Sequence, residues 1–243
     1  MSETAAAAES ASGADGTPDG ADGAVGADGA HGADGLRERK KRQTYERLSE
    51  TAIALFLEKG FEKVSVAEIA AAAEVSKPTL FRYFPAKEDL VLHRFADHED
   101  EAARVVAGAG GGAGAGSPLE ALHRNFADGL ARRDPVTGLN DDPRVLAFHG
   151  LLYGTPSLVA RAYAYQGRSE AVLAEALVRA APSAEPVVAR LAAGQIVAVQ
   201  RVLAEENWRR IAAGESADGV YPDAVAAAEL GFGQLRSGLP FGN

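Results

Sequence analysis

Apolar side chains recur at three- and four-residue intervals through most of this chain, and this spacing restricts its possible folds more than any other feature. Leu48, Ala52, Leu55 and Phe56 are the clearest example, because they form one broad stripe that ends at Gly60. Such a stripe indicates an amphipathic helix, whereas a half-buried strand requires strict alternation of apolar and polar residues. The sequence has no alternating segment, so we predict an all-α protein.

Capping residues and prolines divide the chain into predicted helices. After the helix that ends near Gly60, Ser65 begins a short helix, and Glu68 lies at the spacing of a reciprocal capping box. Ser76 begins a second short helix with Pro78 in its first turn, where a missing N–H costs little. A longer helix is expected from 85 to about 106, and a Gly- and Ala-rich linker at 108–117. Further helices are predicted at about 118–133, 143–153, 156–180, 184–213 and 221–237.

Charge is distributed unevenly, which supports a division into segments 1–35, 36–95 and 96–243. The net charge is −9, but residues 36–95 hold twelve Lys or Arg against nine acids, whereas residues 1–35 hold seven acids and no Lys or Arg. The local field, rather than the total, governs the encounter with an anionic partner. Residues 1–35 repeat Ala-Asp-Gly and offer little to bury, so we predict a disordered acidic tail. The tail is either inert or folds back on the basic segment that follows it.

The two short helices with a tight turn between them predict a helix-turn-helix at 36–95. Leu80 and Phe84 fall on the inward face of the second helix, while Lys77, Phe81 and Arg82 fall on the outward face. A helix of this size fits the DNA major groove, and basic and hydroxyl residues at helix starts suit phosphate contacts. This region therefore predicts binding of double-stranded DNA.

The same residues resemble the tetracycline-repressor (TetR) family. The resemblance is carried by Gly60-Phe61, Val64-Ser65-Val66, Glu68-Ile69-Ala70, the run from Val75 to Phe84 and Lys87-Glu88-Asp89-Leu90. It implies an N-terminal three-helix helix-turn-helix DNA-binding domain and a C-terminal helical ligand-binding and dimerisation domain. It also implies a cytoplasmic homodimeric transcription regulator, a repressor that a small-molecule inducer releases from a palindromic operator. An activator of the same fold is the alternative.

Carried over by position, the resemblance assigns contacts within the DNA complex. Lys77 and Pro78 would meet bases, Phe81 would lie in the groove, and other positions would contact phosphates, although Tyr83 also suits packing. Phe81 and Glu74 depart from the family, where Tyr and Gly are frequent. A positive φ at Glu74 would imply strain of about 1 kcal/mol. The implied DNA-binding residues are Ser65, Ser76, Lys77, Pro78, Thr79, Phe81, Arg82, Tyr83 and Lys87.

The C-terminal half is predicted to hold an inducer pocket and a dimer interface. Trp208-Arg209-Arg210 is similar to members with acyl-CoA-like ligand domains, which suggests a hydrophobic or acyl ligand. Apolar residues on the last two helices, such as Leu191 and Leu230, suit packing against a second copy, with ordinary core packing as the alternative. The predicted pocket residues are Phe126, Phe148, His149, Tyr153, Arg161 and Tyr163.

Other classes of protein are disfavoured by what the sequence lacks. It contains no cysteine, no Gly-rich phosphate loop after a strand and no nucleophile elbow, so we predict neither an enzyme nor a cofactor. His93 and Asp97 have the spacing of a metal pair, with His98 and Glu99 nearby, but no third ligand is evident, which leaves a helical metal-dependent enzyme as the alternative. No apolar run reaches the about 18–20 residues of a membrane span, so no membrane partner is expected.

Overall fold

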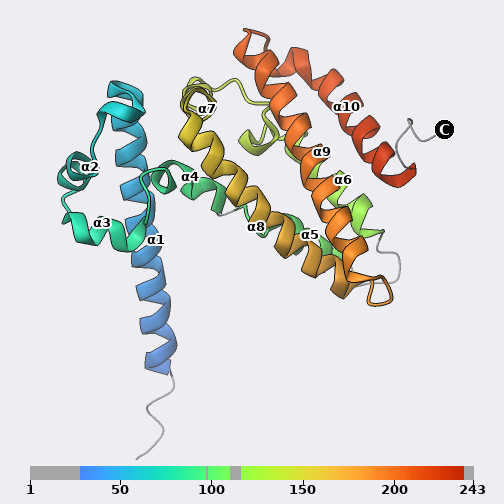
Figure 1. Ribbon diagram of the computed structural model, residues 1–243, viewed down its shortest axis with the longest axis horizontal. Helices are drawn as coiled ribbons and strands as arrows, with labels where there is room; N and C mark the ends of the chain where they lie inside the picture. Colours follow the sequence, from blue (N-terminus) through green and yellow to red (C-terminus); the bar gives the residue numbers. More distant parts are fainter. Residues whose placement is uncertain (1–27, 97, 110–115, 238–243) are drawn as a thin grey trace, which may run out of the picture. The chain divides into compact units, whose positions relative to one another are not determined.

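The computed structural model describes residues 28–96, 98–109 and 116–237, and within these ranges every regular element is helical (Figure 1). The predicted all-α class is therefore confirmed. Two compact units meet at Arg42, inside the first helix, and the elements discussed below lie in the second unit, Gln43–Asn243. The elements are α1 Asp28–Lys59, η1 Phe61–Lys63, α2 Val66–Ala72, α3 Lys77–Tyr83, α4 Asp89–Ala96, α5 Glu101–Ala109, α6 Pro118–Ala131, η2 Pro135–Thr137, α7 Pro143–Gly154, α8 Pro156–Ala180, α9 Pro186–Ala212 and α10 Ala217–Ser237.

Prolines begin α6, α7, α8 and α9, and the sequence predicted the first three of these starts, whereas α9 was expected to begin at about 184. Pro118, Pro143, Pro156 and Pro186 each lie in the first turn of a helix, where the backbone N–H has no helical partner in any case. Ser117 completes a full capping box with Glu120 at the start of α6. These local signals account for the agreement between predicted and observed boundaries.

Three predicted boundaries are wrong, and one of them is the start of the last helix, which lies at Ala217 rather than at about 221. The single helix expected over 85–106 is two helices, because α4 ends at Ala96 and α5 begins at Glu101 after a turn at 98–100. In that turn His98 Nδ1 lies 2.6 Å from the Glu101 carboxylate. Helix α1 begins at Asp28, inside the segment predicted as a disordered tail. The rest of that tail, residues 1–27, and most of the predicted linker, residues 110–115, lie outside the described residues.

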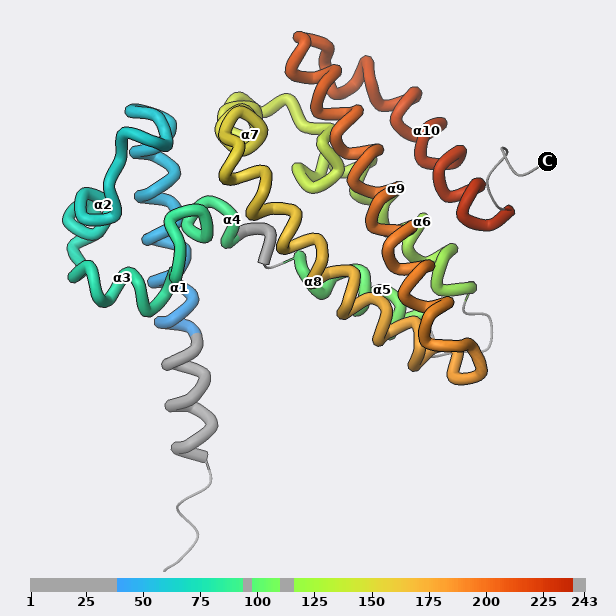
Figure 2. Tube along the Cα trace, viewed as in Figure 1, coloured from blue at the N-terminus to red at the C-terminus, as the bar shows by residue number. Residues whose placement is uncertain are grey.

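The first core packs α1 to α4 together. Phe56 of α1, Ile69 of α2, Leu80 of α3 and Leu90 of α4 are all almost fully buried in it. Leu152 and Leu158, at the adjoining ends of α7 and α8, are buried in the same cluster. The backbone of α8 begins beside α4 (Figure 2). The N-terminal helices therefore share their core with the elements that follow much later in the sequence.

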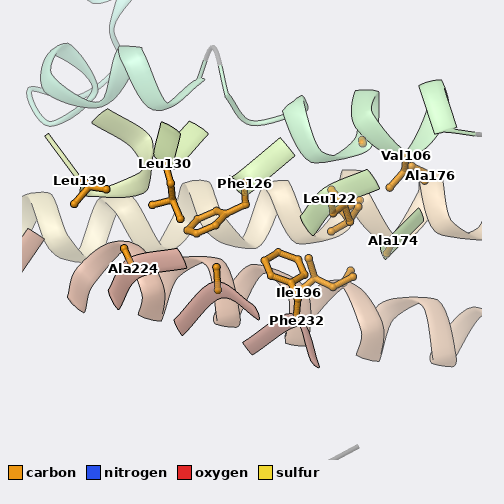
Figure 3. Packing of buried hydrophobic residues seen from close by; sticks show 14 of the residues in the cluster. Val106, Leu122, Phe126, Leu130, Leu139, Ala174, Ala176, Ile196, Ala224 and Phe232 are labelled. Atoms are coloured by element: carbon orange, nitrogen blue, oxygen red, sulfur yellow. The ribbon is translucent and has the colours of Figure 1, made fainter. Parts of the chain in front are cut away.

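The second core lies among α5, α6, α8, α9 and α10. Figure 3 shows Phe126 of α6, Ile196 of α9 and Phe232 of α10 pointing toward one another. The rings of Phe126 and Phe232 have centroids 6.0 Å apart. Helices α8 and α9 run side by side, and α10 packs against α9 and α6 (Figure 1).

Helix α9 is long and largely apolar. By length and composition alone Pro186–Ala212 could cross a membrane, although Arg190 and Arg201 interrupt it and no continuous apolar run of that length is present. In the structure Ala193, Ile196 and Ile211 of this helix lie in the second core, as expected of a bundle helix. Its apolar character extends to residues on the opposite side, where Leu191 is 60% exposed and Val202 is 53% exposed.

The η2 turn lies directly against α9. Gly138 ends this turn with φ 72°, and a Cβ at that position would lie 2.0 Å from the Ala204 carbonyl oxygen. The buried amide of Asn207 donates to the Thr137 carbonyl at 2.9 Å. Only glycine suits both the backbone conformation and the close approach, so the turn is held firmly on the helix.

Candidate functional site

The two short helices α2 and α3 are each begun by a serine. Ser65 Oγ accepts from the Glu68 N–H at 3.1 Å, and Ser76 Oγ accepts from the Thr79 N–H at 3.1 Å. Ser76 and Thr79 also share a hydroxyl hydrogen bond of 2.7 Å. The predicted reciprocal bond from the Glu68 side chain is wrong, because this carboxylate accepts from Lys59 Nζ on α1 instead. Both N-caps are otherwise as predicted.

The turn between the two helices contains a strained residue. Glu74 has φ 54°, so the condition under which strain was expected at this position is met. The turn is closed by hydrogen bonds from the N–H of Glu74 to Ala71 O and from the N–H of Val75 to Ala70 O. These bonds form the Schellman pattern that places one left-handed residue after a helix. The pattern sets the direction in which α3 begins.

Helix α3 presents one face to the core and the other to solvent. Leu80 and the following Phe84 are 1% and 2% exposed. On the other face Lys77 and Arg82 are exposed and Phe81 is 41% exposed, with Lys77 Nζ 5.9 Å from the centroid of the Phe81 ring. The predicted division between inward and outward residues is confirmed. Pro78 is also exposed, while Thr79 is partly buried.

Tyr83, at the end of α3, packs against α1. Its ring lies edge-on to the Tyr45 ring with centroids 4.8 Å apart, and the Arg82 guanidinium lies 5.5 Å from its centroid. Tyr45 also stacks on His93 of α4, with centroids 5.1 Å apart. The ring of Tyr83 therefore helps to fix α3 against α1. Asp97, the other half of the proposed metal pair with His93, lies outside the described residues.

Lys87 has an internal role that sequence reasoning missed. Its ammonium donates to the Phe61 carbonyl oxygen and lies 4.1 Å from the centroid of the Phe61 ring and 5.3 Å from that of Phe56. The partner residues are up to 31 positions away in sequence, so no local pattern reveals the contact. Lys87 joins the segment before α4 to η1, and its remaining N–H donors are the ones available for an external anion.

Two adjoining cavities lie in the C-terminal half. The larger, of about 520 Å³, is lined by Phe148, His149 and Tyr153 of α7 together with η2 and Ala204 of α9. The smaller, of about 260 Å³, is lined by Phe126, Tyr153 and Tyr163 among others. Five of the six predicted pocket residues thus line one or both cavities. Arg161 lines neither, because its guanidinium is bound to Asp89 by hydrogen bonds of 2.8 and 3.0 Å.

His149 and Trp208 carry buried polar atoms with no partner. His149 is 6% exposed, its Nδ1 has no hydrogen-bond partner, and burial lowers its pKa to about 4. The indole N–H of Trp208 is likewise buried without a partner. The Trp208 ring lies 4.6 Å from the Tyr153 ring and 6.4 Å from the His149 ring, centroid to centroid. Buried polar groups are rarely left unpaired in a native protein, so these two atoms require an explanation.

Comparisons with known proteins point to one family. Residues 48–93 match the model described as bacterial regulatory proteins, tetR family. The HTH-type transcriptional regulator TcmR of Streptomyces glaucescens is 37% identical over 138 residues, which cover 56% of this chain. That match spans 58% of the length of TcmR, less than two-thirds of the relative.

Solved structures share the fold at low identity. A tetR-family transcriptional regulator from Mesorhizobium loti is 18% identical, has a TM-score of 0.51, and the match covers 81% of this chain and 96% of that one. Native NalD of Pseudomonas aeruginosa, the secondary repressor of a multidrug efflux pump, is 18% identical with a TM-score of 0.50, and the match covers 79% and 97%. The likeness therefore extends over the C-terminal helices as well as the segment that the family model matches.

Proposed function

We propose, from the premise that this chain belongs to the tetR family of bacterial regulatory proteins, that it is a transcription regulator that binds operator DNA. The observation that carries the proposal is the outward face of α3, where Lys77, Phe81 and Arg82 are exposed above the buried Leu80. A short, firmly packed helix with a basic and aromatic outer face suits insertion into a major groove. Ser65 and Lys87 lie at or before helix starts, where phosphate contacts are favourable.

The active form is a homodimer built on α9 and α10. Leu191 and Val202 of α9 and Leu230 of α10 are 53–66% exposed, although each is large and apolar. Within the same helices Ile196, Ala228 and Phe232 are buried in the chain's own core. The predicted interface residues therefore divide between the core and an uncovered apolar face. Covering that face with a second copy would place two α3 helices on one DNA site, as a palindrome requires.

Regulation is exerted by a small molecule bound in the cavity lined by α7. A cavity of about 520 Å³ is in the size range of sites for drug-sized ligands. Helices α7 and α8 line the two cavities and also contribute Leu152 and Leu158 to the core shared with α1 to α4. Ligand and DNA can thus each weaken the binding of the other through a shift of these helices. We assign the protein as a repressor released by its ligand.

The decisive experiment is selection of bound sequences from random double-stranded DNA by the full-length chain. The expected product is a palindrome whose half-sites are about 10 base pairs apart or a multiple of that. Affinity for the selected site should fall steeply with salt. Absence of any enriched sequence, with binding that is independent of salt, would contradict the proposal. A reporter gene under the selected site then separates repressor from activator.

A further inference from the structure

Helix α7 gives the larger cavity an aromatic part, and the rest of its lining includes the polar residues Asp134, Asn140, Asp142 and Arg144. Phe148, His149 and Tyr153 present three rings from one helix, α7, and Trp208 of α9 packs against two of them. Flat rings prefer edge-to-face or offset packing with other rings, so this part of the cavity favours a flat aromatic occupant over a flexible chain.

The charged groups around the cavities are already paired. Arg144 is held by Asp142 through hydrogen bonds of 3.3 and 3.2 Å, and Arg201 is held by both carboxylate oxygens of Glu205 at 3.0 Å. Arg132 lies 4.0 Å from Asp134. Each of these cations already has an acidic neighbour, which weakens its attraction for a carboxylate or phosphate ligand. The balance of charge therefore disfavours the anionic acyl ligand that the sequence suggested.

The unpaired Nδ1 belongs to His149, which lines the cavity, whereas Trp208 packs against the His149 ring and is not one of the lining residues. The His149 ring is uncharged at neutral pH because burial depresses its pKa, so its two nitrogens supply one donor and one acceptor. The indole of Trp208 supplies a donor only. A ligand hydroxyl can both donate and accept a hydrogen bond, so it could satisfy an acceptor or a donor here.

We infer that this cavity binds an uncharged aromatic molecule whose hydroxyl group is hydrogen-bonded by His149. The inference rests on the proposed function in taking the cavity as the effector site, and it specifies the class of effector. The aromatic rings supply most of the contact area, and the His149–hydroxyl bond distinguishes a phenolic ligand from a plain hydrocarbon of the same size. Because the site carries no uncompensated charge among the lining residues described, uncharged ligands are preferred over anions of similar shape.

The inference can be tested by calorimetric titration of the full chain with four probes: 2-naphthol, naphthalene, 2-naphthoate and decanoate. We expect 2-naphthol to bind at least about tenfold more tightly than the two anions. His149→Phe keeps an aromatic ring but removes the polar atoms, and should weaken 2-naphthol about tenfold while leaving naphthalene unchanged. His149→Asn, which keeps a polar atom near Nδ1, should retain most of the affinity for 2-naphthol.

A matched control is His123→Phe, because His123 stacks on Phe232 with centroids 4.8 Å apart and belongs to neither set of cavity-lining residues. This variant should bind 2-naphthol as the wild type does.

Three results would overturn the inference. They are tighter binding of decanoate or 2-naphthoate than of 2-naphthol, equal binding of 2-naphthol to His149→Phe and to the wild type, and no binding of any probe. Binding of each variant to the selected DNA is measured in parallel. If the protein binds DNA but not 2-naphthol, only the inference about the ligand is refuted. Failure to bind any DNA sequence would refute the proposed function.

Discussion

Arg161 of α8 holds Asp89 at the start of α4 in a two-pronged ion pair, with N–O distances of 2.8 and 3.0 Å. The Asp89 side chain is only 6% exposed, whereas that of Arg161 is 40% exposed. Asp89 also accepts from the Ala86 N–H at 3.1 Å and so caps the turn that leads into α4. The Asp89 carboxylate thus links α4 to α8, a helix that lines the smaller cavity.

Removing this arginine should destabilise the protein more than a surface ion pair would. Arg161→Leu leaves a buried carboxylate without its main partner and should lower the free energy of unfolding by about 2–3 kcal/mol. Arg168→Leu is the matched control, because Arg168 lies on the same helix and pairs with Glu99 at 3.0 Å with a similarly exposed side chain. Its cost should stay below about 1 kcal/mol. Equal losses for the two variants in urea unfolding would contradict the special role of Arg161.

The positive φ of Glu74 makes this position one where glycine should be better than the native residue. Glu74→Gly should raise the free energy of unfolding by about 1 kcal/mol, because glycine adopts φ 54° without the steric cost of a Cβ. Glu74→Ala keeps the Cβ and should bring no such gain. The comparison is made by thermal and urea unfolding. If the alanine variant is as stable as the glycine variant, backbone strain is not the cause.

Lys77 and Lys87 should behave differently when each is replaced by alanine. Lys77 is exposed on α3, so Lys77→Ala should leave stability within about 0.5 kcal/mol of the wild type. It should weaken DNA binding by about 1–3 kcal/mol and change base preference at one position of each half-site. Lys87→Ala should also cost stability, because it removes the bond to the Phe61 carbonyl and the contacts with two rings. Chemical unfolding and repeated DNA selection separate the two effects.

His149 should make stability depend on pH between about 4 and 6.5. Burial lowers its folded-state pKa to about 4, below the ordinary 6.5, so the unfolded chain binds the proton first as the solution is acidified. Stability contributed by the neutral ring is therefore present above pH 6.5 and is lost as the pH falls toward 4, by about 3 kcal/mol in total. The His149→Phe variant should lack this part of the slope. The free energy of unfolding in urea is measured at a series of pH values for both proteins. If it depends on pH in the same way in both, His149 is not the source of the pH dependence.

Leu230 offers the sharpest test of the homodimer. It is 66% exposed on α10, and Leu230→Glu should convert the dimer to a monomer without unfolding it. Leu57→Glu is the control, because Leu57 is also exposed, at 44%, but lies on α1. Sedimentation velocity should show a change of mass for the first variant only. A wild-type chain that sediments as a monomer would refute the proposed assembly.

Features set by short-range patterns were predictable from the sequence. The serine caps of α2 and α3, the proline-started helices and the outward face of α3 all depend on residues within a few positions of one another. The 3.6-residue period alone separates Lys77 and Phe81 from Leu80. The positive φ of Glu74 was only a conditional expectation, which came from the glycine that the TetR family often has at this position.

Contacts between distant positions could not be predicted in this way. Arg161 and Asp89 are 72 residues apart, and nothing in either segment marks the other as its partner. Arg161 was assigned to the pocket as a polar residue of the region expected to form it, but its guanidinium pairs with Asp89 of α4 instead. The η2 wall of the cavity was missed because a single 3₁₀ turn has no periodic signal.

The close approach of Gly138 to Ala204 limits how the proposed ligand cavity can change its specificity. Any side chain at 138 would collide with the backbone of α9, so one wall of the binding chamber tolerates almost no variation. Changes in the choice of the proposed ligand would then come from other lining residues, such as Phe148 and Tyr153 of α7. A library intended to retune this sensor should therefore randomise that helix and leave the turn untouched.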